Sequence, residues 1–229
     1  MTLHFRREIE HLKEMILELG TIVEETLQNA ITALAEGDKE TAQQILDDDQ
    51  RIDMKEVEVE EECLKILALH QPVARDLRYV IAVLKINNDL ERVGDLASNI
   101  AERVLSVASE RDIMAKFDFG TMLEMVLKML RLSMNALINQ DAATGREVCK
   151  LDDEVDRAHE EKFRIIQEFI IEDPTRAPIY IQYLSVSRYL ERIADQTTNI
   201  AEDVIYMVEG DIIRHDKKKL GFQDETKKA

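Results

Sequence analysis

The feature that most constrains this chain is an internal repeat. The sixteen residues from Asp89 to Val104 and the sixteen from Tyr189 to Val204 share nine identities at an offset of one hundred. Earlier in each half the offset is 103, and the run from Asp49 to Asp53 matches the run from Asp152 to Asp156. Chance does not reproduce one order of motifs over most of a chain, so we expect two copies of one structural unit.

Each unit is predicted to contain three long helices, because few residues in the chain can end a helix. Only 7 glycines and 3 prolines occur in 229 residues, which is too few for the tight turns of a sheet protein. Between the breaks, apolar residues recur at spacings of three and four. One predicted helix ends at Gly37, and Asp38 is a good N-cap for the next, which runs to about Leu69. The last helix is predicted from about Pro178 to Asp216.

The predicted fold is therefore all-α, with two tandem three-helix bundles related by internal duplication and pseudo-two-fold symmetry. A single continuous bundle of six helices is the structural alternative. We expect the first repeat over residues 1–110 and the second over residues 111–216. Residues 217–229 form a polar, basic tail that we expect to be disordered.

The charge balance excludes several classes of partner. Lys and Arg number 30 against 47 Asp and Glu, for a formal net charge of −17. A surface that acidic repels nucleic acids and anionic lipids. The longest apolar run, Tyr79–Leu84, is far too short to insert into a membrane. Cys63 and Cys149 are isolated and the N-terminus lacks the apolar core of a signal peptide, so we expect a reduced, cytoplasmic protein.

The repeat also preserves acidic residues, which folding alone does not require. Residues at i, i+4 and i+11 share one face of a helix, since eleven steps of 100° return within about 20° of the start. Such faces occur on the second and third predicted helices of both halves. Their acids are Asp49, Asp53, Glu91, Asp95 and Glu102 in the first half, and Asp152, Asp156, Glu191, Asp195 and Glu202 in the second, with Asn99 and Asn199 beside them.

These acids are predicted to be metal ligands. Like charges at i and i+4 destabilise a helix by about 0.2–0.5 kcal/mol per pair, so something should compensate them. Arg92 and Arg192 lie about 100° off the acidic faces and are poor partners on their own helices. Carboxylates from two packed helices suit hard divalent cations, or iron and manganese. The two asparagines are candidates for hydrogen bonds that support the ligands. A salt-bridged surface without metal is the alternative.

One histidine lies close to an acidic pair. His159 follows Asp156 by three residues, and Glu56 holds the equivalent place in the first half. His159 could join a metal site, but a histidine on the helix surface is the preferred interpretation. A carboxylate-bridged di-metal enzyme, acting on phosphoesters or oxygen, is the rival function. The lack of a histidine set and of an obvious nucleophile weighs against it.

The sequence resembles the PhoU family, over about residues 3 to 212. The resemblance is carried by two stretches, Arg75–Glu102 and Ser187–Gly210, and by acid-x-x-x-Asp motifs in the same order in both halves. One departure is Gln196, where many members are expected to have histidine. If that position supports metal, the second site should differ from the first in affinity or metal identity.

The resemblance implies a fold, a cofactor and a role. The family fold is two three-helix bundles, often homodimeric, and in some members the acid-x-x-x-Asp motifs bind multinuclear metal clusters. Iron, zinc, manganese and nickel are the expected metals. Family members are not known as enzymes, and they act as negative regulators of the phosphate-starvation response. They are thought to connect the ATPase subunit of the phosphate-specific ABC transporter with the phosphate-sensing histidine kinase, and to restrain phosphate uptake.

Overall fold

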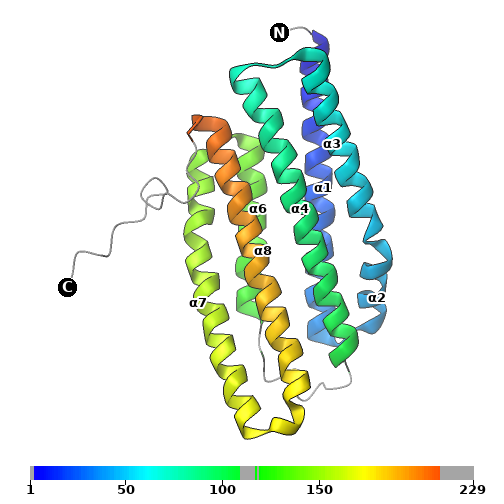
Figure 1. The fold of residues 1–229 in the computed structure, drawn as a ribbon, viewed down its shortest axis with the longest axis vertical. Coiled ribbons are helices and arrows are strands. Elements are labelled where there is room, and N and C mark those ends of the chain that lie inside the picture. The colour runs from blue at the N-terminus through cyan, green and yellow to red at the C-terminus, as the bar shows by residue number, and fades with distance from the viewer. Residues whose placement is uncertain (1–2, 109–116, 118, 212–229) are drawn as a thin grey trace, which may run out of the picture.

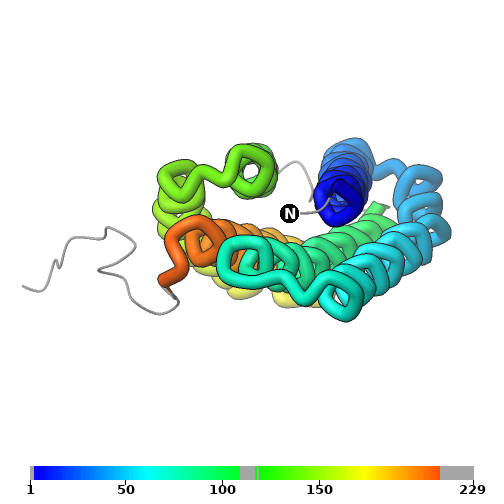
Figure 2. The backbone as a smooth tube through the Cα atoms, turned by 90° about the horizontal axis from the view of Figure 1, so that it is seen from above, coloured from blue at the N-terminus to red at the C-terminus, as the bar shows by residue number. Residues whose placement is uncertain are grey.

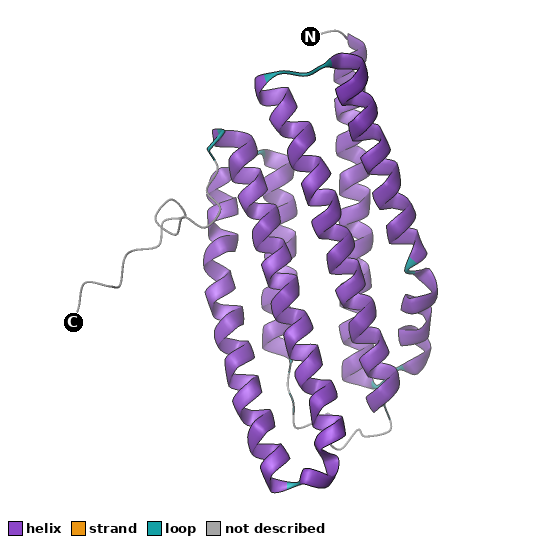
Figure 3. Cartoon of the chain, in the orientation of Figure 1, coloured by secondary structure: helices purple, strands orange, loops and turns teal. Residues whose placement is uncertain are grey.

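A computed structural model describes residues 3–108, 117 and 119–211 of the protein. This part of the chain consists of helices and short loops and contains no strand (Figure 3). None of its helices has the length and the apolar composition needed to cross a membrane. The helices are α1 (Leu3–Glu36), α2 (Lys39–Asp48), α3 (Gln50–His70), α4 (Ala74–Val107), α6 (Gly120–Asn139), α7 (Ala142–Glu172), the short 3-10 helix η1 (Pro174–Arg176) and α8 (Ala177–Glu209).

The helices form two three-helix bundles packed side by side. In Figure 1, α4 and α8 lie next to each other at the centre, with α3 and α2 at one edge and α7 at the other. The view from above in Figure 2 shows that α1 and α6 form a second layer behind them. The first bundle is thus α1, α2–α3 and α4, and the second is α6, α7 and α8. This confirms the predicted pair of duplicated bundles.

The two bundles are joined mainly through α4 and α8, which run antiparallel. Lys85 Nζ donates to Asp203 Oδ1 at 2.9 Å, and Arg103 Nη1 donates to Gln182 Oε1 at 2.9 Å. Residue numbers rise along α4 as those of its contacts on α8 fall. Positions 103 and 203 are equivalent in the repeat, and each reaches across to the opposite central helix.

The second helix of the first bundle departs from the prediction. It was expected to be continuous from Asp38 to about Leu69, but it breaks at Asp49 into α2 and α3. The Ile52 N–H donates to the Asp49 carbonyl at 3.0 Å, a tighter turn than an α-helix makes. Asp49 ends a run of three aspartates, and its carboxylate accepts the Ser98 hydroxyl of α4 at 2.7 Å. Aspartate often bonds outside the helix in this way, which weakens helix interiors.

The end of the last helix also differs from the prediction. α8 ends at Glu209 because Gly210 takes a left-handed conformation, with φ of 79°. A left-handed residue closes a helix and is readily adopted by glycine. The predicted continuation to Asp216 falls mostly outside the described residues. The basic tail at 217–229 and the boundary at residue 110 lie outside them too.

Two glycines allow the helices that carry the candidate site to approach closely. A Cβ at Gly94 of α4 would lie 2.8 Å from Ile52 Cδ1 of α3. A Cβ at Gly145 of α7 would lie 3.1 Å from the Ala201 carbonyl oxygen and 3.0 Å from Ile205 Cγ1, both on α8. The spacing of each helix pair therefore depends on the absence of a side chain at these positions.

Replacing Gly145 tests this close approach. We expect Gly145→Val to lower the free energy of unfolding by about 2 kcal/mol, because the branched side chain meets the α8 backbone, which cannot rotate away. Gly20→Ala is the matched control, since the nearest atom there is the flexible end of Met134. Urea denaturation measures both. A loss in Gly20→Ala as large as in Gly145→Val would contradict the explanation.

Candidate metal centre

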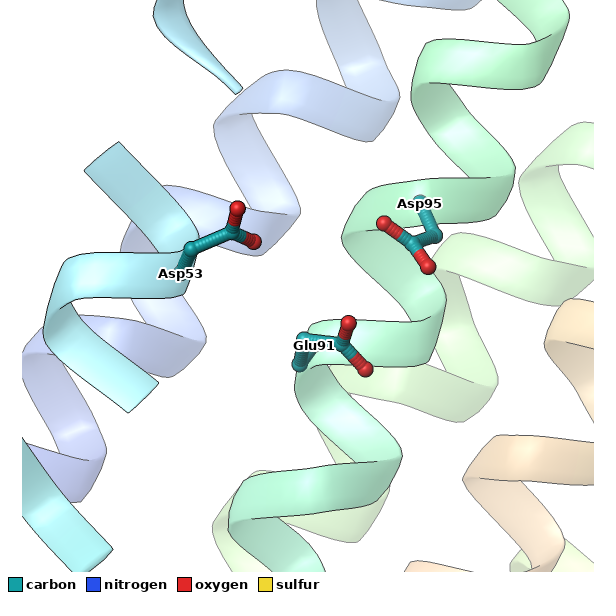
Figure 4. Close-up of side chains that lie close together, drawn as sticks. All are labelled: Asp53, Glu91 and Asp95. Carbon is teal, nitrogen blue, oxygen red and sulfur yellow. The ribbon is translucent and has the colours of Figure 1, made fainter. Parts of the chain in front are cut away.

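Three carboxylates converge where α3 packs against α4. Asp53 of α3 and Glu91 and Asp95 of α4 each offer one oxygen, and these three oxygens lie within 4.8 Å of one another (Figure 4). Asp53 and Asp95 are exposed, whereas Glu91 is half-buried. No other set of three His, Cys, Asp or Glu residues in the described ranges converges as closely. The structure thus brings together three of the predicted ligands from two helices.

Two more acids lie beside these three. Asp49, at the break between α2 and α3, accepts the hydrogen bond from Ser98. Glu56, which was not among the predicted ligands, is held by Asn87 of α4, whose Nδ2 donates to Glu56 Oε1 at 3.2 Å and to its carbonyl at 2.8 Å. We call the five acids the first carboxylate cluster: Asp49, Asp53, Glu56, Glu91 and Asp95.

Burial and mutual repulsion raise the pKa values of two acids of this cluster. Burial raises the pKa of Glu91 to about 7, and the charges of Asp95 and Asp53 add to the effect. Arg92 opposes that shift, but does not cancel it. Burial and then Asp49 raise the pKa of Asp95 as well. Mutual repulsion in a partly desolvated site is what a bound cation would relieve.

A second carboxylate cluster, which we define as Asp152, Asp156, Glu191 and Asp195, lies where α7 packs against α8. Burial raises the pKa of Asp152 to about 7, with Asp156 and Asp195 contributing. The pKa values of Glu191 and Asp195 are also raised, again first by burial and then by acidic neighbours. Asp152 Oδ1 is buried without a hydrogen-bond partner in the described part of the chain, while the Thr198 side chain interacts with the same carboxyl and opposes the rise of its pKa.

Other predicted site residues lie differently. Glu102 is exposed, and its carboxylate accepts from Arg103 Nη2 at 2.7 Å instead of joining the converging set. Asn99 donates to the backbone carbonyl of Asp95 at 2.8 Å and not to a carboxylate. Glu202 is half-buried close to Cys149, whose thiol pKa is raised by burial and then by this charge. Asn199 is half-buried on α8, one turn beyond Asp195.

His159 is not the surface histidine that was the preferred interpretation. It is half-buried between α7 and α8, and its Nδ1 lies 2.9 Å from the Ser187 hydroxyl. Burial lowers its pKa, while the nearby Asp156 opposes the shift. The match of His159 to Glu56 in the repeat was the sequence signal that pointed to both residues. Burial across the helix pair was not visible in the sequence.

The donor set of the clusters fits hard metal ions. Carboxylate oxygens from two helices can surround a divalent cation or iron, and no cysteine lies among them. The buried oxygen of Asp152 and the raised pKa values fit the same interpretation, because burial and acidic neighbours outweigh the effect of nearby positive charges on these carboxylates. Ligands would therefore come from the two clusters, on opposite sides of the α4–α8 pair.

Comparison with known proteins agrees with the duplicated architecture. A domain family described as "PhoU domain" matches the chain twice, over residues 16–104 and 119–204. Among curated proteins, a phosphate-specific transport system accessory protein PhoU homolog of Aquifex aeolicus is 36% identical, and the match covers 91% of this chain and 95% of that protein. A homolog with the same name from Pseudomonas putida is 35% identical over 92% of this chain and 83% of its own length.

Solved structures give the same result. The crystal structure of PhoU from Pseudomonas aeruginosa superposes with a TM-score of 0.84 at 34% identity, covering 90% of this chain and all of that one. The phosphate transport system regulatory protein PhoU from Streptococcus pneumoniae superposes with a TM-score of 0.81 at 30% identity, covering 91% of this chain and 98% of that one.

Proposed function

Because the chain belongs to the PhoU family, we propose that it is an accessory protein of phosphate transport that restrains phosphate uptake and represses the phosphate-starvation response. The observation that carries this proposal is the family match in both repeats, together with relatives named phosphate-specific transport system accessory proteins that match over nearly their full length. The protein acts in the cytoplasm, without catalysis, as a homodimer. Its partners are the ATPase subunit of the phosphate transporter and the phosphate-sensing histidine kinase.

The two carboxylate clusters are proposed to hold metal ions. In the first, Asp53, Glu91 and Asp95 are the core ligands, and the close approach of their oxygens supports this role. In the second, the equivalents are Asp156, Glu191 and Asp195, with Asp152 deeper in the protein. The metal, which we take to be iron, manganese, zinc or nickel, supplies positive charge. The carboxylates orient it and fix α3 against α4 and α7 against α8, which shapes the surface offered to partners.

Elemental analysis of untagged protein tests the metal part of the proposal. We expect at least one equivalent of metal in the wild type, partial loss in Asp53→Asn/Asp95→Asn, and nearly complete loss when Asp156→Asn/Asp195→Asn is added. Glu58→Gln is the matched control, because this exposed acid of α3 pairs with Lys55 outside the cluster. Wild-type protein that stays metal-free after reloading would contradict metal binding and show that both clusters are only charged surface.

A reporter of phosphate starvation tests the cellular role. In cells that lack the gene, the reporter is expected to be active even with abundant phosphate, and the wild-type gene should silence it. Co-purification with the transporter ATPase subunit tests the proposed contact directly. A reporter that responds normally to phosphate without the gene would contradict the proposal, whatever the metal content.

A further inference from the structure

The end of the first bundle where α3 joins α4 carries a group of exposed apolar side chains. The start of α1 lies at the same end (Figure 1), and the rings of Phe5 and His70 are 5.0 Å apart between centroids. Single exposed apolar residues are ordinary, but several at one place mark an interaction site. We call the following four residues the apolar tip: Leu3, Leu69, Val73 and Leu77, which are 68%, 66%, 74% and 39% exposed.

The backbone of the apolar tip is held in an uncommon conformation. Gln71 and Ala74 have positive φ values of 45° and 50°, although neither is glycine. Such conformations persist only where the surrounding structure holds them, and they concentrate at functional sites. Val73 lies between these two residues, and its carbonyl accepts the Asp76 N–H at 3.2 Å. The loop therefore presents the Val73 side chain in a defined place, which lowers the entropy cost of binding a partner.

Positive charge surrounds the apolar tip, although the chain as a whole carries −17. Residues 3–13 and 62–78 together contain six Lys and Arg against four Asp and Glu. One of those acids, Glu8, is buried and is ion-paired within the bundle end. Arg6 and Arg7 are exposed, and no carboxylate of the described residues forms an ion pair with either. This end of the molecule is therefore locally basic.

The equivalent connection of the second bundle, at the opposite end of the molecule (Figure 1), is built differently. There Asp173 accepts the Thr175 N–H at 3.2 Å and pairs with Arg176 at 3.7 Å, so the cation is neutralised. In the first bundle α4 begins without a side-chain cap. Arg75 in its first turn donates to the neutral side chain of Gln140, which orients the guanidinium without cancelling its charge. The duplicated fold thus does not require the basic form of this connection.

We propose that the apolar tip is a docking surface for an acidic segment of a partner protein whose own apolar side chains cover it. The arginines and the uncapped start of α4 attract carboxylates, and burial of the four apolar side chains stabilises the complex. This inference deepens the proposed function, because an accessory protein acts through a partner, but it does not depend on metal binding. An anionic membrane fits less well, since a uniformly negative surface repels the acidic remainder of the chain.

Photo-crosslinking of the full-length protein in cells tests the occupant. A photoreactive amino acid replaces Val73, and the same amino acid at Ile171 is the matched control. Ile171 is 78% exposed at the end of α7, next to the connection at the opposite end. We expect position 73 to capture a segment with more Asp and Glu than Lys and Arg, identified by mass spectrometry. Arg6→Glu/Arg75→Glu should reduce that capture by about tenfold.

Titration with purified components separates the apolar contribution from the charge. The captured segment, made as a synthetic peptide, is titrated into the full-length protein. We expect Val73→Ser/Leu77→Ser to weaken its binding by about tenfold, whereas Ile171→Ser leaves binding unchanged. All these side chains are exposed, so circular dichroism and thermal denaturation should show folded proteins of similar stability. Vesicles of phosphatidylglycerol are the second probe, and we expect no binding to them.

The outcomes separate this inference from the proposed function. Capture at position 73 no stronger than at position 171, or a captured segment without an excess of acids, would overturn the docking surface. Binding to phosphatidylglycerol vesicles that Val73→Ser/Leu77→Ser abolishes would overturn it too, and would indicate a membrane instead. If the starvation reporter does not respond to loss of the gene, the proposed function fails, while the crosslinking result still decides whether an acidic partner occupies the tip.

Discussion

Metal-free protein is expected to become less stable as pH rises from about 4 to about 8. The pKa values of Glu91 and Asp152 are raised to about 7 in the folded protein, whereas unfolded acids titrate near 4. Between these values the folded chain binds more protons than the unfolded chain, so each increase in pH favours unfolding. The loss begins near pH 4 and is complete above pH 7. Because solvent screens these partly exposed groups, we expect each to reduce the free energy of unfolding by only about 1–2 kcal/mol.

Neutral substitutions should remove this pH dependence. Glu91→Gln and Asp152→Asn are each expected to raise the free energy of unfolding at pH 8 by about 1–2 kcal/mol, with little change at pH 4.5. Urea denaturation at several pH values, in the presence of a chelator, measures this. Glu58→Gln is the control. Carboxyls with lowered pKa values, such as Glu8 beside His70, make the protein less stable as the pH falls, but only below about pH 4.5. Wild-type stability that is constant from pH 5 to 8 would contradict the explanation.

Truncating Tyr183 is expected to have the largest effect on stability. This side chain of α8 is fully buried, and its ring lies 5.2 Å from that of Phe117 and 6.4 Å from that of Phe119, measured between centroids. Tyr183→Ala leaves a large cavity among these rings and should lower the free energy of unfolding by about 3–5 kcal/mol. Thermal and urea denaturation measure the loss.

A half-buried tyrosine on the same helix gives the matched control. Tyr189→Ala removes an identical group from a site that water already reaches, so we expect a loss of only about 1 kcal/mol. Similar losses in Tyr183→Ala and Tyr189→Ala would show that the aromatic contacts at Phe117 and Phe119 contribute little.

The helix pattern was predictable because the chain marks its breaks with specific residues. Asp38 and Asp141 begin the second helix of each unit, and each accepts a backbone N–H of the first turn, from Glu40 at 3.0 Å and Ala143 at 2.9 Å. Local chemistry of this kind is visible in a sequence. The break at Asp49 was not visible in this way, because the equivalent residue, Asp152, lies inside the continuous helix α7. Helix propensity alone does not distinguish the two positions.

The candidate site was predictable only as far as spacing along a single helix determines it. Spacing along one helix correctly paired Glu91 with Asp95, and the repeat supplied their equivalents. Spacing does not say how far a side chain lies from the neighbouring helix, so Glu102 was grouped with them although it pairs with Arg103 instead. The burial of His159 was missed for the same reason, since it depends on how α7 packs against α8.

The antiparallel contact of α4 with α8 has a consequence for the origin of the protein. In a two-fold symmetric dimer, each copy offers the same patch to the other, so equivalent residues make reciprocal contacts. Arg103 and Asp203 approach this arrangement, because each reaches across the central helices and their partners, Gln182 and Lys85, occupy places in the repeat that differ by three residues. The chain therefore has the architecture of a dimer whose two subunits have been fused by gene duplication. In a dimer of identical subunits a mutation alters both halves at once. In a fused chain each half can change alone, and this chain has Glu56 in one half where it has His159 in the other.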